Sequence, residues 1–206
     1  MKNTAGVTID NIFYTLEDLE KDTWLRLLNG ALKSKDAFHT ASVATLKADV
    51  ISLRTVVLRK VIQRDKQLRF HTDTRSNKWK ELEQNNAISM LFYGPSARVQ
   101  LRVSGVAVLH YQDEITDLAW QNTSLSSRRI YLTSLPPSSY IDLPADGLEG
   151  LFENGNPTLL ESEAGKQNFG VINVQVSNID WLWLNHAGHR RAFFNYENQE
   201  YNWVAP

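Results

Sequence analysis

The sequence predicts a mainly β fold: a small antiparallel barrel of six or so strands with appended helices. Three observations lead to this prediction. Segments with strand character dominate the chain, and several lie close enough together to form hairpins. Helical patterns are few and lie at the periphery of the strand segments. Residues 99–111 alternate apolar and polar side chains and contain Gly105, which we expect to form a bulge where a closed sheet must bend.

The first half of the chain contains two predicted helices and four predicted strands. The first helix is predicted at residues 15–32, where apolar residues form an approximate stripe. Thr15 is its expected N-cap, and acidic residues follow in the first turn. Residues 76–84 form the second helix, with Ser76 as its N-cap. The strands are expected at 38–46, which carries no charge, at 55–62, which is rich in β-branched residues, and at 68–72 and 87–93.

The second half continues with the long strand at 99–111, a helix at 112–122 and a partly helical piece at 124–132. Residues 134–165 show no clear strand or helix pattern. They contain four of the six prolines and more acidic than basic residues. So long a stretch with little pattern is usually a functional excursion or a mobile loop. The strand pattern returns at 169–176 and 179–184, and two aromatic-rich strands at 190–196 and 201–204 complete the sheet.

Composition limits the classes of function. We expect residues 1–206 to form a single domain with a sizeable core. The formal charge of −1 attracts neither nucleic acid nor an anionic membrane as a whole. The absence of cysteine excludes a disulfide scaffold and thiolate metal sites. No segment approaches the roughly 20 apolar residues of a membrane span. We therefore expect a cytoplasmic protein without nucleic-acid or membrane partners.

Cations and hydroxyls gather where the second helix is expected to begin. Thr72, Arg75, Ser76 and Lys78 lie in this stretch, and Arg54 opens the strand before it. The free N–H groups and the positive dipole end of a helix N-terminus favour an anion there. The pattern is consistent with a phosphate site, although a solvated basic face is the commoner meaning of such residues.

This segment resembles the FMN-binding core of the pyridoxamine-5'-phosphate-oxidase-like flavoproteins. In that family a strand of the type R-x-V-x-L-[RK] is followed by an aromatic-or-His-Thr pair and then by an R-S-x-K element. Here they read Arg54-Thr55-Val56-Val57-Leu58-Arg59, His71-Thr72 and Arg75-Ser76-Asn77-Lys78. The resemblance extends from about Trp24 to Pro206 and includes Gln100-Leu101-Arg102 and His189-Arg190-Arg191. It implies an FMN-binding split β-barrel that works as a homodimer, with two FMN sites at the subunit interface.

The resemblance also implies roles for individual residues. The FMN phosphate would be bound by Arg54, Thr72, Arg75, Ser76 and Lys78. The flavin ring would lie along the strand of Thr55, Val56, Val57 and Leu58, near His71 and Gln100. Arg59 would lie beside the pyrimidine edge and favour the reduced anionic flavin. Arg191 would reach the flavin from the partner subunit.

Departures from the family pattern argue against vitamin B6 oxidase activity. The Tyr and Arg that grip the substrate phosphate in those oxidases fall near Ala119 and Thr123, and only Ser127 remains. The Arg of an Arg-x-His pair is replaced by Ala187, which leaves His189. The flavin-contacting Trp aligns with Leu182, between Trp181 and Trp183. Ser127, Arg128 and His189 therefore become the candidates for contact with a different small-molecule substrate.

Two functions remain open from the sequence. The first is an FMN-dependent oxidoreductase acting on an unknown small molecule, for which no catalytic acid or base can be named. The second is an FMN carrier or ligand-binding module without turnover, and F420 or haem could replace FMN in the same cleft. An open cavity lined by Arg128, Arg129 or His189 would favour the enzyme, and a cleft plugged by residues 134–165 would favour the carrier. No metal site is expected, because His186 and His189 lack a third ligand.

Overall fold

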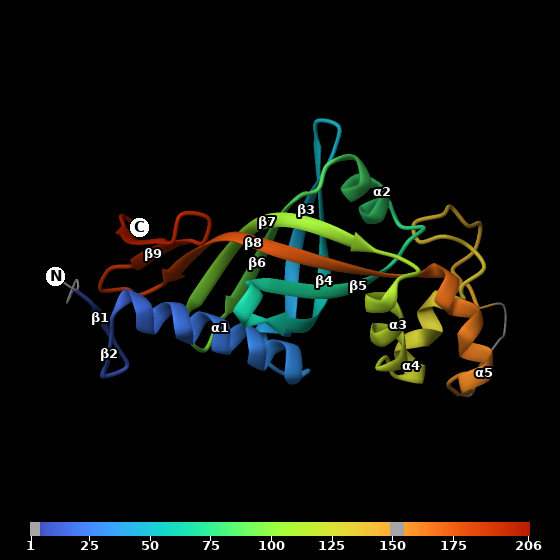
Figure 1. Ribbon diagram of the computed structural model, residues 1–206, viewed down its shortest axis with the longest axis horizontal. Helices are drawn as coiled ribbons and strands as arrows, with labels where there is room; N and C mark the ends of the chain where they lie inside the picture. Colours follow the sequence, from blue (N-terminus) through green and yellow to red (C-terminus); the bar gives the residue numbers. More distant parts are fainter. Residues whose placement is uncertain (1–4, 149–154) are drawn as a thin grey trace.

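Six antiparallel strands form a closed barrel in the computed structural model, which describes residues 5–148 and 155–206 (Figure 1). The strands follow one another around the barrel in the order β3-β4-β5-β8-β7-β6, and β6 pairs with β3 to close it. Their bounds are β3 Thr40–Lys47, β4 Val50–Ile62, β5 Gln67–Asp73, β6 Ala87–Gly94, β7 Val99–His110 and β8 Phe169–Trp183. The predicted mainly β fold is confirmed.

The other elements surround this barrel. A C-terminal hairpin, β9 (Arg190–Asn195) and β10 (Glu200–Val204), extends the sheet beyond β8, and β1 (Val7–Ile9) pairs only with β2 (Ile12–Tyr14). The helices are α1 (Leu16–Leu32), α2 (Asn77–Gln84), α3 (Glu114–Gln121), α4 (Leu125–Arg128) and α5 (Leu159–Ser162), and the 3-10 turns are η1 (Ala37–His39), η2 (Gln63–Asp65), η3 (Arg129–Leu132) and η4 (Glu163–Asn168). No helix in the described ranges is long and apolar enough to cross a membrane.

Helix α1 covers one side of the barrel, and its start was correctly predicted (Figure 1). Thr15 and Asp18 form a capping box, in which each side chain bonds the other residue's backbone N–H. Trp24 is fully buried against the barrel and donates its Nε1–H to the Tyr196 hydroxyl at 2.9 Å. Ser76 caps α2 as predicted, accepting a hydrogen bond from the N–H of Trp79.

Gly105 lies at a break in the β7–β8 register, as the sequence predicted. A Cβ built at this position would lie 2.1 Å from the backbone oxygen of Gln175. We therefore expect Gly105→Ala to lower the free energy of unfolding by about 2–3 kcal/mol, because the backbone of β8 must move to relieve the overlap. Urea denaturation followed by tryptophan fluorescence measures this change. Gly155→Ala is the control, since its Cβ would meet nothing within 4 Å, and equal losses in both variants would contradict the expectation.

The structure differs from the sequence prediction at several boundaries. β4 begins at Val50, five residues before the predicted start, because its first half, residues 50–57, pairs with the whole of β3 up to the turn at Ala48. The two strands predicted at 169–176 and 179–184 are the single strand β8, which is long because it pairs with β5, β7 and β9. The β1–β2 hairpin was missed.

A second core lies beside the barrel, around Trp120 of α3. Its indole packs edge-on against Phe169 and Tyr131, with ring centroids 5.1 and 5.9 Å away. This aromatic cluster holds α3, η3 and the start of β8 together. The described part of the 134–165 excursion contains no strand, and only α5 and the first turn of η4 are helical there.

Candidate functional site

Four of the five predicted phosphate residues converge at one end of the barrel, where β5 leads into α2. The Nζ of Lys78 donates to the Thr72 hydroxyl, which lies 3.3 Å from the Ser76 hydroxyl. Arg54 points inward from β4 and pairs with Glu81 of α2 at 2.8 Å. These four side chains, Arg54, Thr72, Ser76 and Lys78, form what we call the Lys78 cluster.

Lys78 is the cation of this cluster that has no carboxylate within 4 Å among the residues that the structure describes. Burial, and then the positive charge of Arg54, lower the pKa of Lys78 to about 8, while Asp73 and Glu81 oppose the shift. Arg54, by contrast, is matched by Glu81, whose carboxylate also accepts from Thr45 and Ser52. A half-buried ammonium beside two hydroxyls fits an incoming phosphate, because the phosphate would supply the missing negative charge.

Arg75 does not join the Lys78 cluster. Its guanidinium pairs with Asp73 at 2.7 Å and donates to the backbone oxygen of Thr133 at 2.9 Å. Its side chain therefore ties the start of α2 to the segment that follows η3. The sequence could not reveal this, because the partner, Thr133, lies 58 residues away.

The residues predicted to line the flavin ring divide between the two faces of β4. Val56 and Leu58 point into the barrel core, whereas Thr55, Val57 and Arg59 point outward. His71 points outward from β5, beside this row. Burial, then the charges of Arg59 and Arg69, lower the pKa of His71 to about 3, so its imidazole is neutral at physiological pH.

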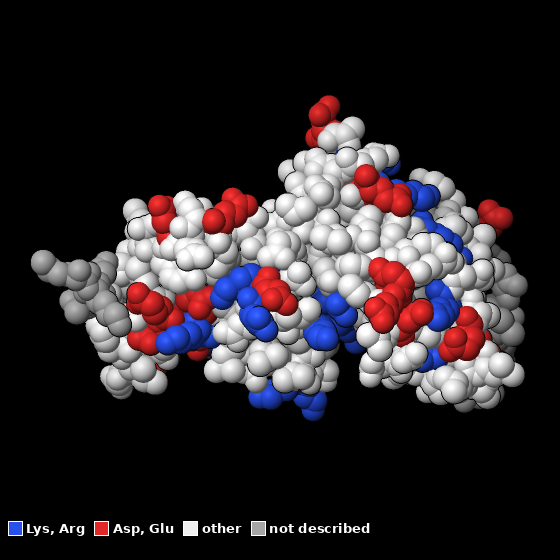
Figure 2. Space-filling view, viewed as in Figure 1, with Lys and Arg blue, Asp and Glu red and all other residues white. Residues whose placement is uncertain are grey.

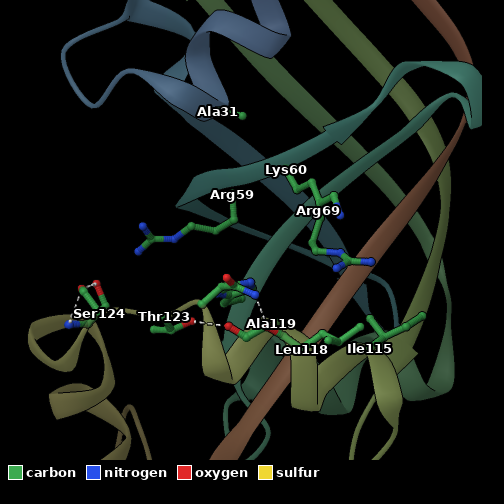
Figure 3. A pocket seen from close by; sticks show the side chains of 12 residues that line it. Ala31, Arg59, Lys60, Arg69, Ile115, Leu118, Ala119, Thr123 and Ser124 are labelled. Atoms are coloured by element: carbon green, nitrogen blue, oxygen red, sulfur yellow. Dashed lines mark hydrogen bonds between the residues drawn. The ribbon is translucent and has the colours of Figure 1, made fainter.

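Next to this outer face is a cleft of about 660 Å³ between the β4–β5 pair and helices α3 and α4. Arg59, Lys60 and Arg69 extend from the strands, with Ile115, Leu118 and Ala119 on the facing helix (Figure 3). Figure 2 shows Lys and Arg atoms at the edge of the hollow between the surface over α1 and the surface over α3 and α4. The full lining is Ala31, Arg59, Lys60, Arg69, His71, Ile115, Leu118, Ala119, Asn122, Thr123, Ser124 and Ser127.

This lining differs from the sequence prediction. Arg59, His71 and Ser127 line the cleft, whereas Arg128, Arg129 and His189 do not, and neither does any described residue of 134–165. Lys60 and Arg69 were missed as site residues. Their positions in the sequence could have indicated them. Arg69 and His71 are two residues apart on one strand and so share a face, and Lys60 directly follows Arg59.

Arg128 is a structural residue rather than a group that faces the cleft. Only 3% of it is exposed, and its guanidinium lies 4.5 Å from the centroid of the Trp120 ring. It donates to the Ser162 hydroxyl and the Glu163 carboxylate at 3.0 and 2.9 Å, and also to the backbone oxygens of Thr123 and Trp120. The hydrogen bonds and the ion pair of the Arg128 guanidinium therefore connect α4 to α5 and η4.

Gln100 and Arg191 lie on a different part of the surface, with Leu182 between them in register. Arg191 donates two hydrogen bonds to Asp180, at 2.8 and 2.6 Å, and Arg102 donates to the same carboxylate. Burial alone would raise the pKa of Asp180, but these hydrogen bonds outweigh it and the pKa lies below its usual range. Leu182 shares this outer face, whereas Trp181 and Trp183 are buried in the core.

His189 is exposed in the turn before β9, where its Nδ1 accepts a hydrogen bond from the N–H of Asn185. His186 is exposed in the same turn. Across residues 5–148 and 155–206, no three His, Asp or Glu side chains are grouped so that they could hold a metal ion.

The barrel, the Lys78 cluster and the cleft that begins at His71, the neighbour of Thr72, fit a protein that binds a phosphate-bearing organic cofactor. Comparison with known proteins shows which family this chain resembles. Residues 21–111 match the family model for the FMN-binding domain of pyridoxamine 5'-phosphate oxidase. Pyridoxine/pyridoxamine 5'-phosphate oxidase of Leptospira biflexa is 28% identical over 174 residues, which are 81% of this chain and 76% of that protein.

Two solved structures share the fold. One is a pyridoxamine 5'-phosphate oxidase-related, FMN-binding protein of Nostoc punctiforme, with a TM-score of 0.70 and 24% identity over 90% of this chain and 97% of that one. The other is PhzG of Burkholderia lata, in complex with tetrahydrophenazine-1-carboxylic acid, with a TM-score of 0.70 and 17% identity over 97% and 100% of the two chains. The predicted resemblance is confirmed: residues 21–111 match an FMN-binding domain of the pyridoxamine 5'-phosphate oxidase type, and the cofactor of that type of domain is FMN.

Proposed function

We propose that this protein is a homodimeric, cytoplasmic FMN-dependent oxidoreductase that acts on a small molecule in the cleft beside β4 and β5. The observation that carries the proposal is the Lys78 cluster, where a half-buried cation has no ion-pair partner among the described residues. The open cleft begins one residue away, at His71, the neighbour of Thr72. In this proposal Lys78, Thr72 and Ser76 bind the FMN phosphate, together with Arg54. When bound, the flavin supplies the hydride or electron chemistry, and the protein supplies position and charge.

Arg59 is proposed to lie beside the flavin ring. It points outward from β4 next to Val57, and within the described residues it forms no ion pair or side-chain hydrogen bond. A free cation at the ring edge would stabilise negative charge on the reduced flavin. The neutral imidazole of His71 beside it can exchange hydrogen bonds without adding charge.

The barrel geometry supports a homodimer. Two strands separate β4 from β7 in either direction around the barrel, through β3 and β6 or through β5 and β8. Outward side chains of β4 and β7, such as Arg59 and Gln100, therefore point in opposite directions and cannot contact one small ligand within one chain. If Gln100 and Arg191 contribute to the flavin site, they do so from a second copy of the chain.

The exposed surface of the sheet fits such a partner. Leu53 of β4 and Leu91 and Tyr93 of β6, the strands on either side of β3, are 69%, 40% and 46% exposed. Burial of apolar side chains like these is the usual driving force for obligate dimers. No described residue of 134–165 plugs the cleft, so the feature expected of a carrier does not occur there. Arg128, Arg129 and His189, which were expected to line the cleft of an enzyme, do not line it either, and the support for an enzyme is that the cleft is open.

The test is the visible absorption spectrum of the purified protein, repeated after FMN is added to the apo form. We expect flavin bands, at about 450 nm, that remain with the protein through gel filtration at the mass of a dimer. Bleaching of the bound flavin by a small organic substrate without dithionite would support the enzyme, whereas bleaching by dithionite alone would support the carrier. A colourless protein that takes up no FMN would contradict the proposal.

A further inference from the structure

Three cations face the cleft, and two of them are directly opposite each other on neighbouring strands. Lys60 of β4 pairs in register with Arg69 of β5, just after a bulge that turns Arg59 and Lys60 to the same side. Like charges at directly opposed positions of a sheet are destabilising. No carboxylate of the described residues forms an ion pair with Arg59, Lys60 or Arg69. An anion between the strands and α3 would remove this repulsion.

Arg69 is held in one orientation by a chain of hydrogen bonds. Its Nε donates to Asn173 Oδ1 at 2.7 Å, and Asn173 Nδ2 lies 3.2 Å from His110 Nε2. His110 Nδ1 lies 2.7 Å from the carboxylate of Asp113, the residue that caps α3. The carboxylate accepts from Nδ1–H, so Nε2 accepts from the Asn173 amide and Oδ1 must face Arg69.

The terminal nitrogens of Arg69 remain available. They have no hydrogen-bond partner among the described residues, while the Nε is fully used. The guanidinium is half-buried, and burial lowers the pKa of Arg69, with the charge of Asp113 opposing the shift. A half-buried guanidinium that is fixed at one nitrogen and free at two is arranged to bind an oxyanion with two parallel hydrogen bonds.

We propose that Lys60 and Arg69 bind the oxyanion of an organic acid substrate whose apolar body lies on Ile115, Leu118 and Ala119 of α3. The facing helix is apolar at these positions, and the cleft of about 660 Å³ is large enough for a small ring compound. The anion is thus bound from the sheet, and the helix positions Ala119 and Thr123 add no charge. This inference rests on the proposed function for its substrate role but not for the binding itself.

The experiment measures binding of three probes to the FMN-loaded protein and to the apo protein by isothermal titration calorimetry. Benzoate and phenyl phosphate carry the oxyanion, and benzamide is a neutral analogue of similar shape. We expect both anions to bind at least tenfold more tightly than benzamide, and the tighter of the two identifies the oxyanion as carboxylate or phosphate ester. Equal affinity for benzoate, phenyl phosphate and benzamide would overturn the inference.

Two variants locate the binding. Arg69→Gln should weaken binding of the tighter-binding anion about tenfold or more. Lys60→Gln, at an exposed position that does not affect folding, should weaken it at least about threefold. Arg64→Gln is the matched control, because it removes the same charge from η2, between the same two strands but outside the cleft. A loss in Arg64→Gln equal to that in Arg69→Gln would show a general charge effect and overturn the inference.

The cofactor phosphate is the competing explanation for these cations. We therefore compare FMN with riboflavin, which lacks the phosphate, in wild type and Arg69→Gln. Unchanged FMN affinity supports the inference, whereas a loss for FMN and not for riboflavin would assign Arg69 to the cofactor phosphate and overturn it. Anion binding to an apo protein that takes up no FMN would support this site while contradicting the proposed function, so the two failures are distinguishable.

Discussion

Replacing Lys78 by methionine is expected to weaken FMN binding about 100-fold and to make the apo protein more stable. The affinity falls because a charge-assisted hydrogen bond to phosphate is lost, a change of about 1.5–3 kcal/mol. The free energy of unfolding of the apo protein rises because the folded state destabilises the charged ammonium of Lys78. The pKa of Lys78 is about 8, against an ordinary value of 10.5. At pH 7 both the folded and unfolded states carry the charge, so the whole cost, roughly 3 kcal/mol, is relieved in the variant.

The direction of the pH dependence follows from the same shift. Between pH 8 and 10.5 the folded state loses the Lys78 proton before the unfolded state does, so wild-type stability rises and the advantage of the variant shrinks. FMN affinity of the wild type should fall above pH 8, because the phosphate then requires uptake of a proton by Lys78. Affinity of the variant should not fall there.

Flavin-fluorescence titration and urea denaturation measure the two effects. Riboflavin tests the assignment to phosphate, since its affinity should be the same in wild type and Lys78→Met. Lys80→Met is the matched control on the same helix, at an exposed position. Equal losses of FMN and riboflavin affinity in Lys78→Met would mean that Lys78 does not bind the phosphate.

Replacing Arg128 by methionine is expected to lower the free energy of unfolding by about 3 kcal/mol. The guanidinium is buried and is the donor to two backbone oxygens, the Ser162 hydroxyl and the Glu163 carboxylate. Its removal breaks these four hydrogen bonds. The Trp120 oxygen keeps the N–H of Thr123 as a donor, and the Glu163 carboxylate keeps the Nε1–H of Trp120. The cost therefore falls mainly on the Thr123 oxygen and the Ser162 hydroxyl, because buried polar groups that lose their partners are costly. Urea denaturation measures the loss.

Arg129→Met is the control for Arg128→Met. Arg129 is adjacent in sequence, but its ion pair with Asp146 is long, at 3.6 Å, and Asp146 is largely exposed, so we expect a loss of less than about 1 kcal/mol. FMN affinity should be unchanged in both variants. An Arg128→Met protein as stable as the wild type would contradict the structural role.

The sequence was sufficient to predict those features that depend on local chemistry. Thr15 and Ser76 were identified as helix caps because a side-chain oxygen bonds an N–H only three residues away. Gly105 marked the bulge because only a residue without Cβ allows β8 to approach so closely. The positions of Arg54, Thr72, Ser76 and Lys78 along two strands and a helix start predicted that these side chains gather, and the family resemblance of the same stretch predicted FMN.

The tertiary structure alone decided which cations are free. Arg75 and Arg128 have the same charge as Lys60 and Arg69, yet the first two are bound by Thr133, Asp73, Ser162 and Glu163, and the last two face the cleft. The bulge after Leu58 turns Lys60 outward, and Asn173, more than 100 residues from Arg69, fixes that guanidinium. The availability of a charge depends on what lies within hydrogen-bond distance after folding, and those partners come from strands and helices remote in the sequence.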